Sequence, residues 1–137
     1  MEIRKALTGD LADIMLLDKH TGSAMLLKCI EDGRVYVAIL NGIMAGCLRF
    51  GYLYDSFPFL NLIYLRDEFR GKGLGTSLMD RWESEMADMG YGIIYTSTQA
   101  DESAQHFYRN RGYEDIGAFR PPEQKVLEII LCRRIDK

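Results

Sequence analysis

The 137-residue chain contains few of the residues that cross-link a fold or stiffen it: three cysteines, three prolines and one tryptophan. Cys29, Cys47 and Cys132 are odd in number and far apart in the sequence. This pattern argues against both a disulfide framework and a zinc site. The sequence therefore predicts no metal ligands, and it favours a reducing compartment such as the cytoplasm.

Long apolar runs and an excess of basic residues are also missing. No apolar stretch approaches the ~20 residues that a membrane-spanning helix needs. Residues 1–7 carry charges where a signal peptide would be apolar. The net charge of −3 does not fit a nucleic-acid binder, which usually has a basic excess. We therefore expect a cytoplasmic protein that binds neither membranes nor nucleic acid.

The residues that are present fit one folded domain. The hydrophobic fraction of 47% and the charged fraction of 27% are ordinary for a globular protein. Periodicity and turn signals predict a single α/β (α+β) domain over residues 1–137, with six or seven strands in a mixed sheet and flanking helices. We expect strands at 1–6, 35–40, 43–52, 60–65, 93–97, from 113, and at 125–133. We expect helices from 8–10, at 23–31, at 73–89, and from Asp101 or Ser103 to Asn110. The final strand is a candidate edge for pairing in a homodimer.

A strand that leads through a glycine-rich loop into an amphipathic helix is the most informative segment. The loop contains Gly71, Gly73 and Gly75. Arg70 precedes the first glycine, and Lys72 lies between the first two. The first N–H groups of a helix have no intrahelical partner and lie at the positive end of its dipole. Glycines there let the backbone approach an anion, so the segment predicts a phosphate-binding loop. The glycine spacing matches neither the P-loop nor the dinucleotide fingerprint. An ordinary glycine-rich turn is the alternative, because short patterns often match by chance.

Two segments together resemble a known family. Arg70, Gly73 and Gly75 fill the fixed positions of Arg/Gln-x-x-Gly-x-Gly/Ala, the signature of the GNAT superfamily of acetyl-CoA-dependent N-acetyltransferases. Residues 101–113 resemble the second GNAT signature, Asn-x-x-Ala-x-x-Phe-Tyr-x-x-x-Gly-Phe. The identical positions there are Ala104, Phe107, Tyr108 and Gly112. Because both signatures occur in the family's order, the resemblance covers essentially the whole chain.

The resemblance implies a GNAT-like fold in which two parallel strands, here 60–65 and 93–97, splay apart to admit acetyl-CoA. The pantetheine arm would pair with exposed strand backbone, and loop N–H groups would hold the pyrophosphate. The implied cofactor-binding residues are Ile63, Tyr64, Leu65, Arg70, Gly71, Lys72, Gly73, Leu74, Gly75, Thr76 and Asp101. Asp101 replaces the family's asparagine and cannot donate a hydrogen bond. Its alternative role, which the sequence favours, is to cap the following helix.

The implied reaction is direct transfer of the acetyl group to a primary amine of a small molecule or a peptide N-terminus, without a metal. Tyr108 matches the family tyrosine beside the thioester, and its phenol can protonate the leaving thiolate. A core aromatic is the alternative interpretation of Tyr108. Phe59 stands near the position where some members have a glutamate base. Asp55, His20, His106 or water is then left to deprotonate the amine.

The acceptor amine is the least defined part. In the family its pocket is built from segments that correspond here to 17–31 and 52–60. The second segment holds four aromatic residues, Tyr52, Tyr54, Phe57 and Phe59, which would bind a cationic amine through cation–π contacts or simply cover the sheet edge. The alternative function is a non-catalytic module that binds acetyl-CoA as a sensor.

Overall fold

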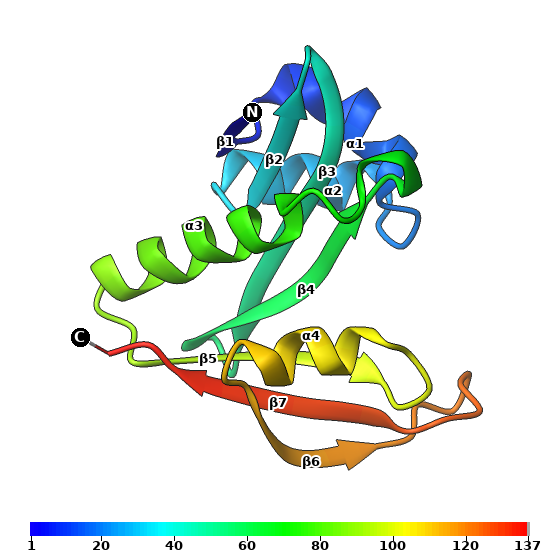
Figure 1. The fold of residues 1–137 in the computed structure, drawn as a ribbon, viewed down its shortest axis with the longest axis vertical. Coiled ribbons are helices and arrows are strands. Elements are labelled where there is room, and N and C mark those ends of the chain that lie inside the picture. Colours follow the sequence, from blue (N-terminus) through cyan, green and yellow to red (C-terminus); the bar gives the residue numbers. More distant parts are fainter. Residues whose placement is uncertain (137) are drawn as a thin grey trace. The chain divides into compact units, whose positions relative to one another are not determined.

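The computed structural model describes residues 1–136, and its strands form one mixed sheet in the order β1-β2-β3-β4-β5-β7-β6 (Figure 1). The strands are β1 (Glu2–Lys5), β2 (Val35–Leu40), β3 (Ile43–Leu53), β4 (Phe57–Leu65), β5 (Ile93–Gln99), β6 (Glu114–Phe119) and β7 (Glu128–Arg134). The helices are α1 (Leu11–Leu17), α2 (Ser23–Glu31), α3 (Leu74–Asp88) and α4 (Ala104–Asn110), with 3₁₀ turns at Thr8–Asp10 and Asp67–Phe69. The predicted α/β fold with a mixed sheet is confirmed.

Residues 54–58 were expected to form an irregular segment between two strands. The structure instead has a tight hairpin turn between β3 and β4 there. The N–H of Ser56 donates to the carbonyl of Leu53 at 3.1 Å. Tyr54 and Asp55 complete the turn with φ angles of 54° and 61°. This left-handed conformation suits a two-residue hairpin but is unfavourable for residues other than glycine, although less so for asparagine and aspartate. β4 therefore begins at Phe57, three residues earlier than predicted.

The final strand, β7, does not lie at an edge of the sheet. It pairs antiparallel with β5, where Tyr95 lies opposite Cys132, and with β6, where Glu114 lies opposite Cys132. The chain returns after β6 and inserts its last strand between β5 and β6, so both sides of β7 are hydrogen-bonded. The expectation that this strand pairs across a dimer is wrong, and the strand at this edge of the sheet is β6.

The structure divides into two compact units. The first comprises Met1–Gly51 and Asn61–Glu85, and the second comprises Tyr52–Leu60 and residues 86–136. No helix within residues 1–136 is long and apolar enough to cross a membrane.

Apolar side chains of α1 and α2 pack against the strands in the first unit. This core consists of Ala6, Ile14, Leu17, Leu26, Cys29, Ile30, Val35, Val37, Met44 and Cys47. α3 contributes Trp82, whose ring centroid lies 5.7 Å from that of Phe50. The residues predicted to share the buried face of α3, namely Leu74, Leu78, Trp82 and Met86, are all buried. Helical periodicity thus identified the packing face of α3 correctly.

In the second unit α4 lies along β5, and β5 pairs with β7 (Figure 1). Alternate residues of β5, Ile94, Thr96 and Thr98, are buried, while the residues between them are half-buried. The sequence predicted burial on both faces of β5, and that prediction is wrong. The alternation is typical of a strand that presents one face to packed side chains.

Candidate functional site

The glycine loop precedes α3 in the first unit, and its glycines have different roles. Gly71 and Gly73 have φ angles of 77° and 81°, and a Cβ at either position would meet nothing within 4 Å. Only their backbone conformation therefore requires glycine. Gly75 is not left-handed, but a Cβ there would lie 3.4 Å from the Leu65 side chain.

The start of α3 offers free hydrogen-bond donors. The helix begins at Leu74, and the N–H of Ser77 donates to the carbonyl of Gly73 at 3.0 Å. The N–H groups of Leu74, Gly75 and Thr76 come before this first intrahelical bond and have no acceptor within the helix. Together with the left-handed glycines they form a cradle open to an anion, which fits a pyrophosphate group.

Arg70 lies beside this cradle and already has three partners. Its Nε donates to the carbonyl of Leu65 at 3.2 Å, and its guanidinium forms an ion pair with Asp67 at 3.2 Å. The guanidinium also lies 5.8 Å from the centre of the Tyr64 ring. These contacts hold the arginine over the end of β4, where the pantetheine arm was expected. The other predicted cation, Lys72, is exposed.

The end of β4 approaches β3 very closely because of a glycine that the sequence analysis missed. A Cβ at Gly46 would lie 2.4 Å from the Leu65 side chain and 2.6 Å from the Tyr64 carbonyl oxygen. Both distances are far below van der Waals contact, so no other residue fits without a shift of β4. A glycine inside a strand is the signal that could have identified it.

β4 and β5 pair in parallel over a short stretch within the second unit. The register joins Phe59 to Tyr95 and Leu60 to Thr96. Both strands continue beyond these pairs, β4 to Leu65 and β5 to Gln99. The parallel pairing therefore covers only part of each strand.

Tyr108 lies on α4 and is buried, with 5% of its surface exposed. Burial raises the pKa of its phenol to about 12, and the negative charges of Glu102 and Glu128 act in the same direction. A side-chain hydrogen bond with Thr96 acts to lower this pKa. The rings of Tyr108 and Tyr113 pack edge to face with centroids 5.6 Å apart. The phenol is thus neutral at physiological pH and held in a fixed position.

Thr96, which the sequence analysis did not single out, connects Tyr108 to the paired strands. Its hydroxyl donates to the carbonyl of Leu60 at 3.2 Å, and its side chain is almost completely buried. The hydrogen bond from Thr96 to Leu60 and the influence of Thr96 on the pKa of Tyr108 define a polar chain in the second unit. The signal in the sequence was threonine at the inward positions of an apolar strand, since buried polar groups need partners.

Asp55 is not brought near this polar chain. It is exposed in the hairpin before β4. Leu60 is the fourth residue of that strand, so at ~3.3 Å per residue at least about 10 Å of strand separates the turn from Leu60.

Asp101 does not cap α4. It is exposed in the turn after β5, and the N-cap position of α4 is Ser103, without a side-chain capping bond. The expectation of a capping role is therefore wrong, because α4 begins three residues beyond Asp101. The contact between Asp101 and the pantetheine arm stays a prediction.

The aromatic segment of the predicted acceptor pocket packs largely within the second unit. The rings of Tyr52 and Tyr91 lie 6.0 Å apart, and those of Phe57 and Tyr95 lie 5.6 Å apart. Tyr54 differs, since 82% of its surface is exposed. The ring contacts favour a structural role for Tyr52 and Phe57.

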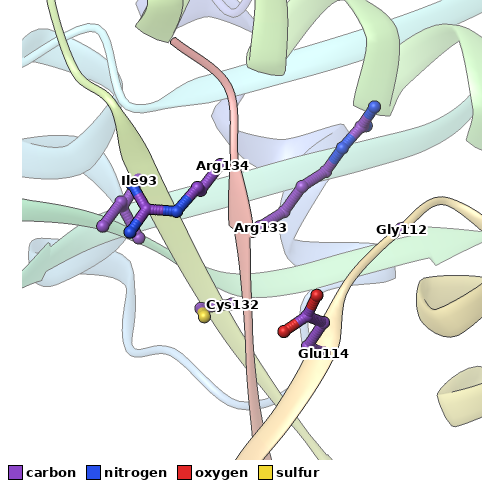
Figure 2. A pocket seen from close by; sticks show the side chains of 6 residues that line it. All are labelled: Ile93, Gly112, Glu114, Cys132, Arg133 and Arg134. Atoms are coloured by element: carbon purple, nitrogen blue, oxygen red, sulfur yellow. The ribbon is translucent and has the colours of Figure 1, made fainter.

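A cavity of about 330 Å³ lies in the second unit, and Tyr108 is not among the residues that line it. It is lined by Ile93, Gly112, Glu114, Cys132, Arg133 and Arg134. Figure 2 shows the two arginine side chains leaving neighbouring positions of β7 in different directions. The thiol pKa of Cys132 is raised by partial burial and by Glu114, so the cavity offers no activated nucleophile. Residues 1–136 also contain no cluster of three or more side chains suited to a metal ion.

The family described as "Acetyltransferase (GNAT) domain" matches residues 31–115, which include the glycine loop and Tyr108. A search of curated proteins gave no significant match.

Solved structures share the fold over almost the whole chain. The ribosomal-protein-S18-alanine N-acetyltransferase of Escherichia coli has 18% identity and a TM-score of 0.84, over 99% of this chain and 94% of that one. Ard1 of Thermoplasma volcanium has 17% identity and a TM-score of 0.87, over 99% and 98%. YncA of Salmonella typhimurium, solved with its cofactor acetyl-CoA, has 18% identity and a TM-score of 0.85, over 100% and 95%.

Proposed function

Because this chain belongs to the GNAT acetyltransferase family, we propose that it transfers the acetyl group of acetyl-CoA to a primary amine of a small molecule or a peptide N-terminus. The observation that carries the proposal is the loop before α3. Gly71 and Gly73 adopt the left-handed conformation there, directly before a helix start with free N–H groups. Anion binding by backbone donors explains why both features occur together.

Acetyl-CoA supplies an activated acetyl thioester, and the residues of the chain bind and orient it. The backbone N–H groups of residues 71–76 hold the pyrophosphate, and Arg70 and Lys72 add positive charge. The backbone of Ile63, Tyr64 and Leu65 pairs with the pantetheine arm, which Asp101 also contacts. An N–H of this strand end donates to the thioester oxygen as negative charge develops there. Such a donor contributes on the order of 3 kcal/mol to transition-state stabilisation.

Tyr108 acts as the general acid that protonates the departing thiolate. The first support is that its raised pKa keeps the phenol protonated at neutral pH, although the same raised pKa makes it a weaker acid. The position of Tyr108 in the family signature is the second support.

The amine must lose a proton before it attacks, because an alkylammonium has a pKa of about 10.4. The role of Asp55 as the general base that removes this proton stays a prediction. Its exposure and its place before β4 favour deprotonation by water instead.

The acceptor is a primary amine, and peptide N-termini belong among the first candidates. The structural likeness to the S18-alanine N-acetyltransferase of E. coli supports their inclusion, although at 18% identity it shows the fold alone. Small amines remain equal candidates.

Thiol release from acetyl-CoA by the purified protein tests the proposal. The panel contains polyamines, amino acids, aminoglycosides and peptides with free N-termini, including N-terminal alanine. Release that depends on one amine class supports the proposal and identifies the acceptor class. Tight acetyl-CoA binding in calorimetry without release by any amine would favour the sensor instead. Absence of acetyl-CoA binding would overturn both functions.

A further inference from the structure

The carboxylate of Glu128, at the start of β7, is held by two neutral donors. The hydroxyl of Ser97 on β5 donates to Oε2 of Glu128 at 2.7 Å, and the side-chain amide of Gln124 donates to Oε1 at 3.2 Å. The same amide also donates to the carbonyl of Val126 at 2.9 Å, and this second bond fixes its direction. The carboxylate is therefore oriented by the fold itself.

Glu128 differs from Asp115 of the same unit because no cation neutralises it. Asp115 pairs with Arg109 at 2.8 Å. No lysine or arginine within residues 1–136 forms an ion pair with Glu128, and its two hydrogen-bond partners are uncharged. Each carboxylate oxygen accepts one of these bonds and keeps further lone pairs. Glu128 is half-buried, and a cation with N–H donors is the ligand that best satisfies such a carboxylate.

The strand register places this carboxylate next to the end of the parallel pairing. Ser97 directly follows Thr96, which lies in the last β4–β5 pair. Glu128 lies opposite Gln99 of β5, and directly opposite residues of an antiparallel pair share a face. Because side chains alternate along a strand, Ser97, Gln99 and Glu128 all lie on the half-buried face, opposite the buried Thr96 and Thr98. A ligand can therefore reach the carboxylate from this face.

An aromatic ring lies on the same face. Tyr95 is half-buried and precedes Ser97 by two residues, which span ~7 Å of strand. The ring of Phe57 packs edge to face against it, with centroids 5.6 Å apart, and so holds it in place. A ligand whose charged end contacts Glu128 can lay an apolar part along Tyr95.

Resting on the proposed function, we propose that Glu128 binds the acceptor as a cation, its carboxylate accepting hydrogen bonds from the ammonium group of an alkylamine whose apolar part packs on Tyr95. Ser97 and Gln124 are positioning residues that orient the carboxylate. No bond of Glu128 forms or breaks, and the bound ammonium gives up its proton to water. The negative charge of Glu128 also raises the pKa of Tyr108, which agrees with an amine held within electrostatic reach of the proposed general acid.

The experiment compares Glu128→Gln, Ser97→Ala and Glu114→Gln with the unmodified protein, using the most active amine of the thiol-release panel. Glu128→Gln keeps the shape and removes the charge. We expect it to raise KM for the amine about tenfold or more, with KM for acetyl-CoA within about twofold. Ser97→Ala should raise KM for the amine about threefold, because the charge remains but loses one of its two donors.

Glu114→Gln is the matched control for the loss of one negative charge. Glu114 lies opposite Cys132, which lies opposite Tyr95, so it shares the face of the sheet with Glu128. It is exposed, and its substitution should leave KM for the amine within about twofold.

Salt separates an effect of charge from an effect on structure. KM of the unmodified protein for the amine should rise between about 0.05 and 0.5 M NaCl, because salt screens the attraction between the ammonium and the carboxylate. Glu128→Gln should lose most of this rise. An unchanged KM for the amine in Glu128→Gln, or the same salt dependence in both proteins, would overturn the inference. If Glu128→Gln does not fold, an unchanged KM in Ser97→Ala would overturn it instead.

Binding measurements separate this inference from the proposed function. If the unmodified protein has no turnover with any amine, the proposed function fails. Calorimetry with spermidine and with a peptide that has an N-terminal alanine then tests the site alone. Binding that Glu128→Gln weakens supports an ammonium site at Glu128, and absence of binding by both amines overturns it. Turnover with the variant results listed as contradictory overturns only the inference.

Discussion

The Nε atom of Arg49 on β3 lies 2.8 Å from a carboxylate oxygen of Asp18 at the end of α1, and the Asp18 side chain is completely buried. The other carboxylate oxygen of Asp18 accepts from the N–H of His20 at 3.1 Å. This ion pair joins the segment between α1 and α2 to β3 of the first unit. Removal of one partner from a buried pair leaves an uncompensated charge, which costs more than the pair contributes.

Arg49→Met should therefore lower the free energy of unfolding by about 3–5 kcal/mol, because Asp18 stays buried without its cation. Urea unfolding at neutral pH measures this change. Arg109→Met is the matched control, since Arg109 pairs with Asp115 at the same 2.8 Å but both side chains are more than a third exposed. That substitution should cost much less than Arg49→Met, because solvent screens the exposed pair. Equal losses in the two variants would contradict the importance of burial.

Gly73→Ala should weaken acetyl-CoA binding by tenfold or more, because the cradle needs the left-handed backbone at φ 81°. Calorimetry with acetyl-CoA measures the affinity. Gly42→Ala is the control, since Gly42 has a φ of 75° and an equally open surrounding in the β2–β3 turn. Both variants should lose about 1 kcal/mol of stability, but only Gly73→Ala should lose affinity. Unchanged affinity would argue against the loop as the binding site.

Tyr108→Phe should lower kcat about 100-fold with a small effect on KM for acetyl-CoA, because only the proton donor is removed. In the unmodified enzyme the phenol of Tyr108 should keep its proton up to about pH 11, since its pKa is raised to about 12. Deprotonation of Tyr108 should therefore cause no decline of kcat below that pH. Steady-state rates between pH 6 and 10.5 test both statements. An alkaline decline near pH 9 that disappears in Tyr108→Phe would contradict the raised pKa, and an unchanged kcat in Tyr108→Phe would contradict the assignment as general acid.

The same buried phenol should make the fold sensitive to alkali. The pKa of Tyr108 is about 12 in the folded protein and 10.0 ordinarily, so the unfolded chain releases the proton first. The neutral phenol of Tyr108 contributes fully to the free energy of unfolding below pH 10. This contribution, up to about 3 kcal/mol, is lost as the pH rises toward 12. Cys47, whose thiol pKa is raised from 9.0 to about 12 mainly by burial, adds a loss that starts near pH 9. Urea unfolding between pH 8 and 11 should show a shallower decline for Tyr108→Phe than for the unmodified protein. Parallel curves would contradict the burial of the phenol.

Asp55→Gly should stabilise the protein by about 0.5–1 kcal/mol, because glycine adopts the φ of 61° without steric cost. Thermal unfolding measures this gain. The exposed position of Asp55 leads us to expect kcat within twofold of the unmodified value. A large loss of kcat in both Asp55→Gly and Asp55→Asn would instead establish Asp55 as the base.

The sequence predicted the features that short segments encode. Asn41 and Gly42 mark a hairpin by residue type, and the hairpin is there, whereas Tyr54 and Asp55 form a similar turn without that signal and it was missed. The glycine loop and Tyr108 were likewise found in local motifs. The contacts of Gly46 with Leu65 and of Thr96 with Leu60 depend on which strands become neighbours. Residues far apart in the chain make these contacts, so periodicity and motifs do not encode them.

The edge strand β6 has a consequence for the behaviour of the protein at high concentration. All six of its residues are exposed, and its register with β7 shifts between Asp115 and Gly117. A strand from another molecule would therefore meet an irregular row of N–H and C=O groups, with the acidic side chains of Glu114 and Asp115 at one end. Bulges and charges of this kind discourage edge-to-edge aggregation. The irregular backbone of β6 therefore makes pairing with a strand of another molecule less favourable.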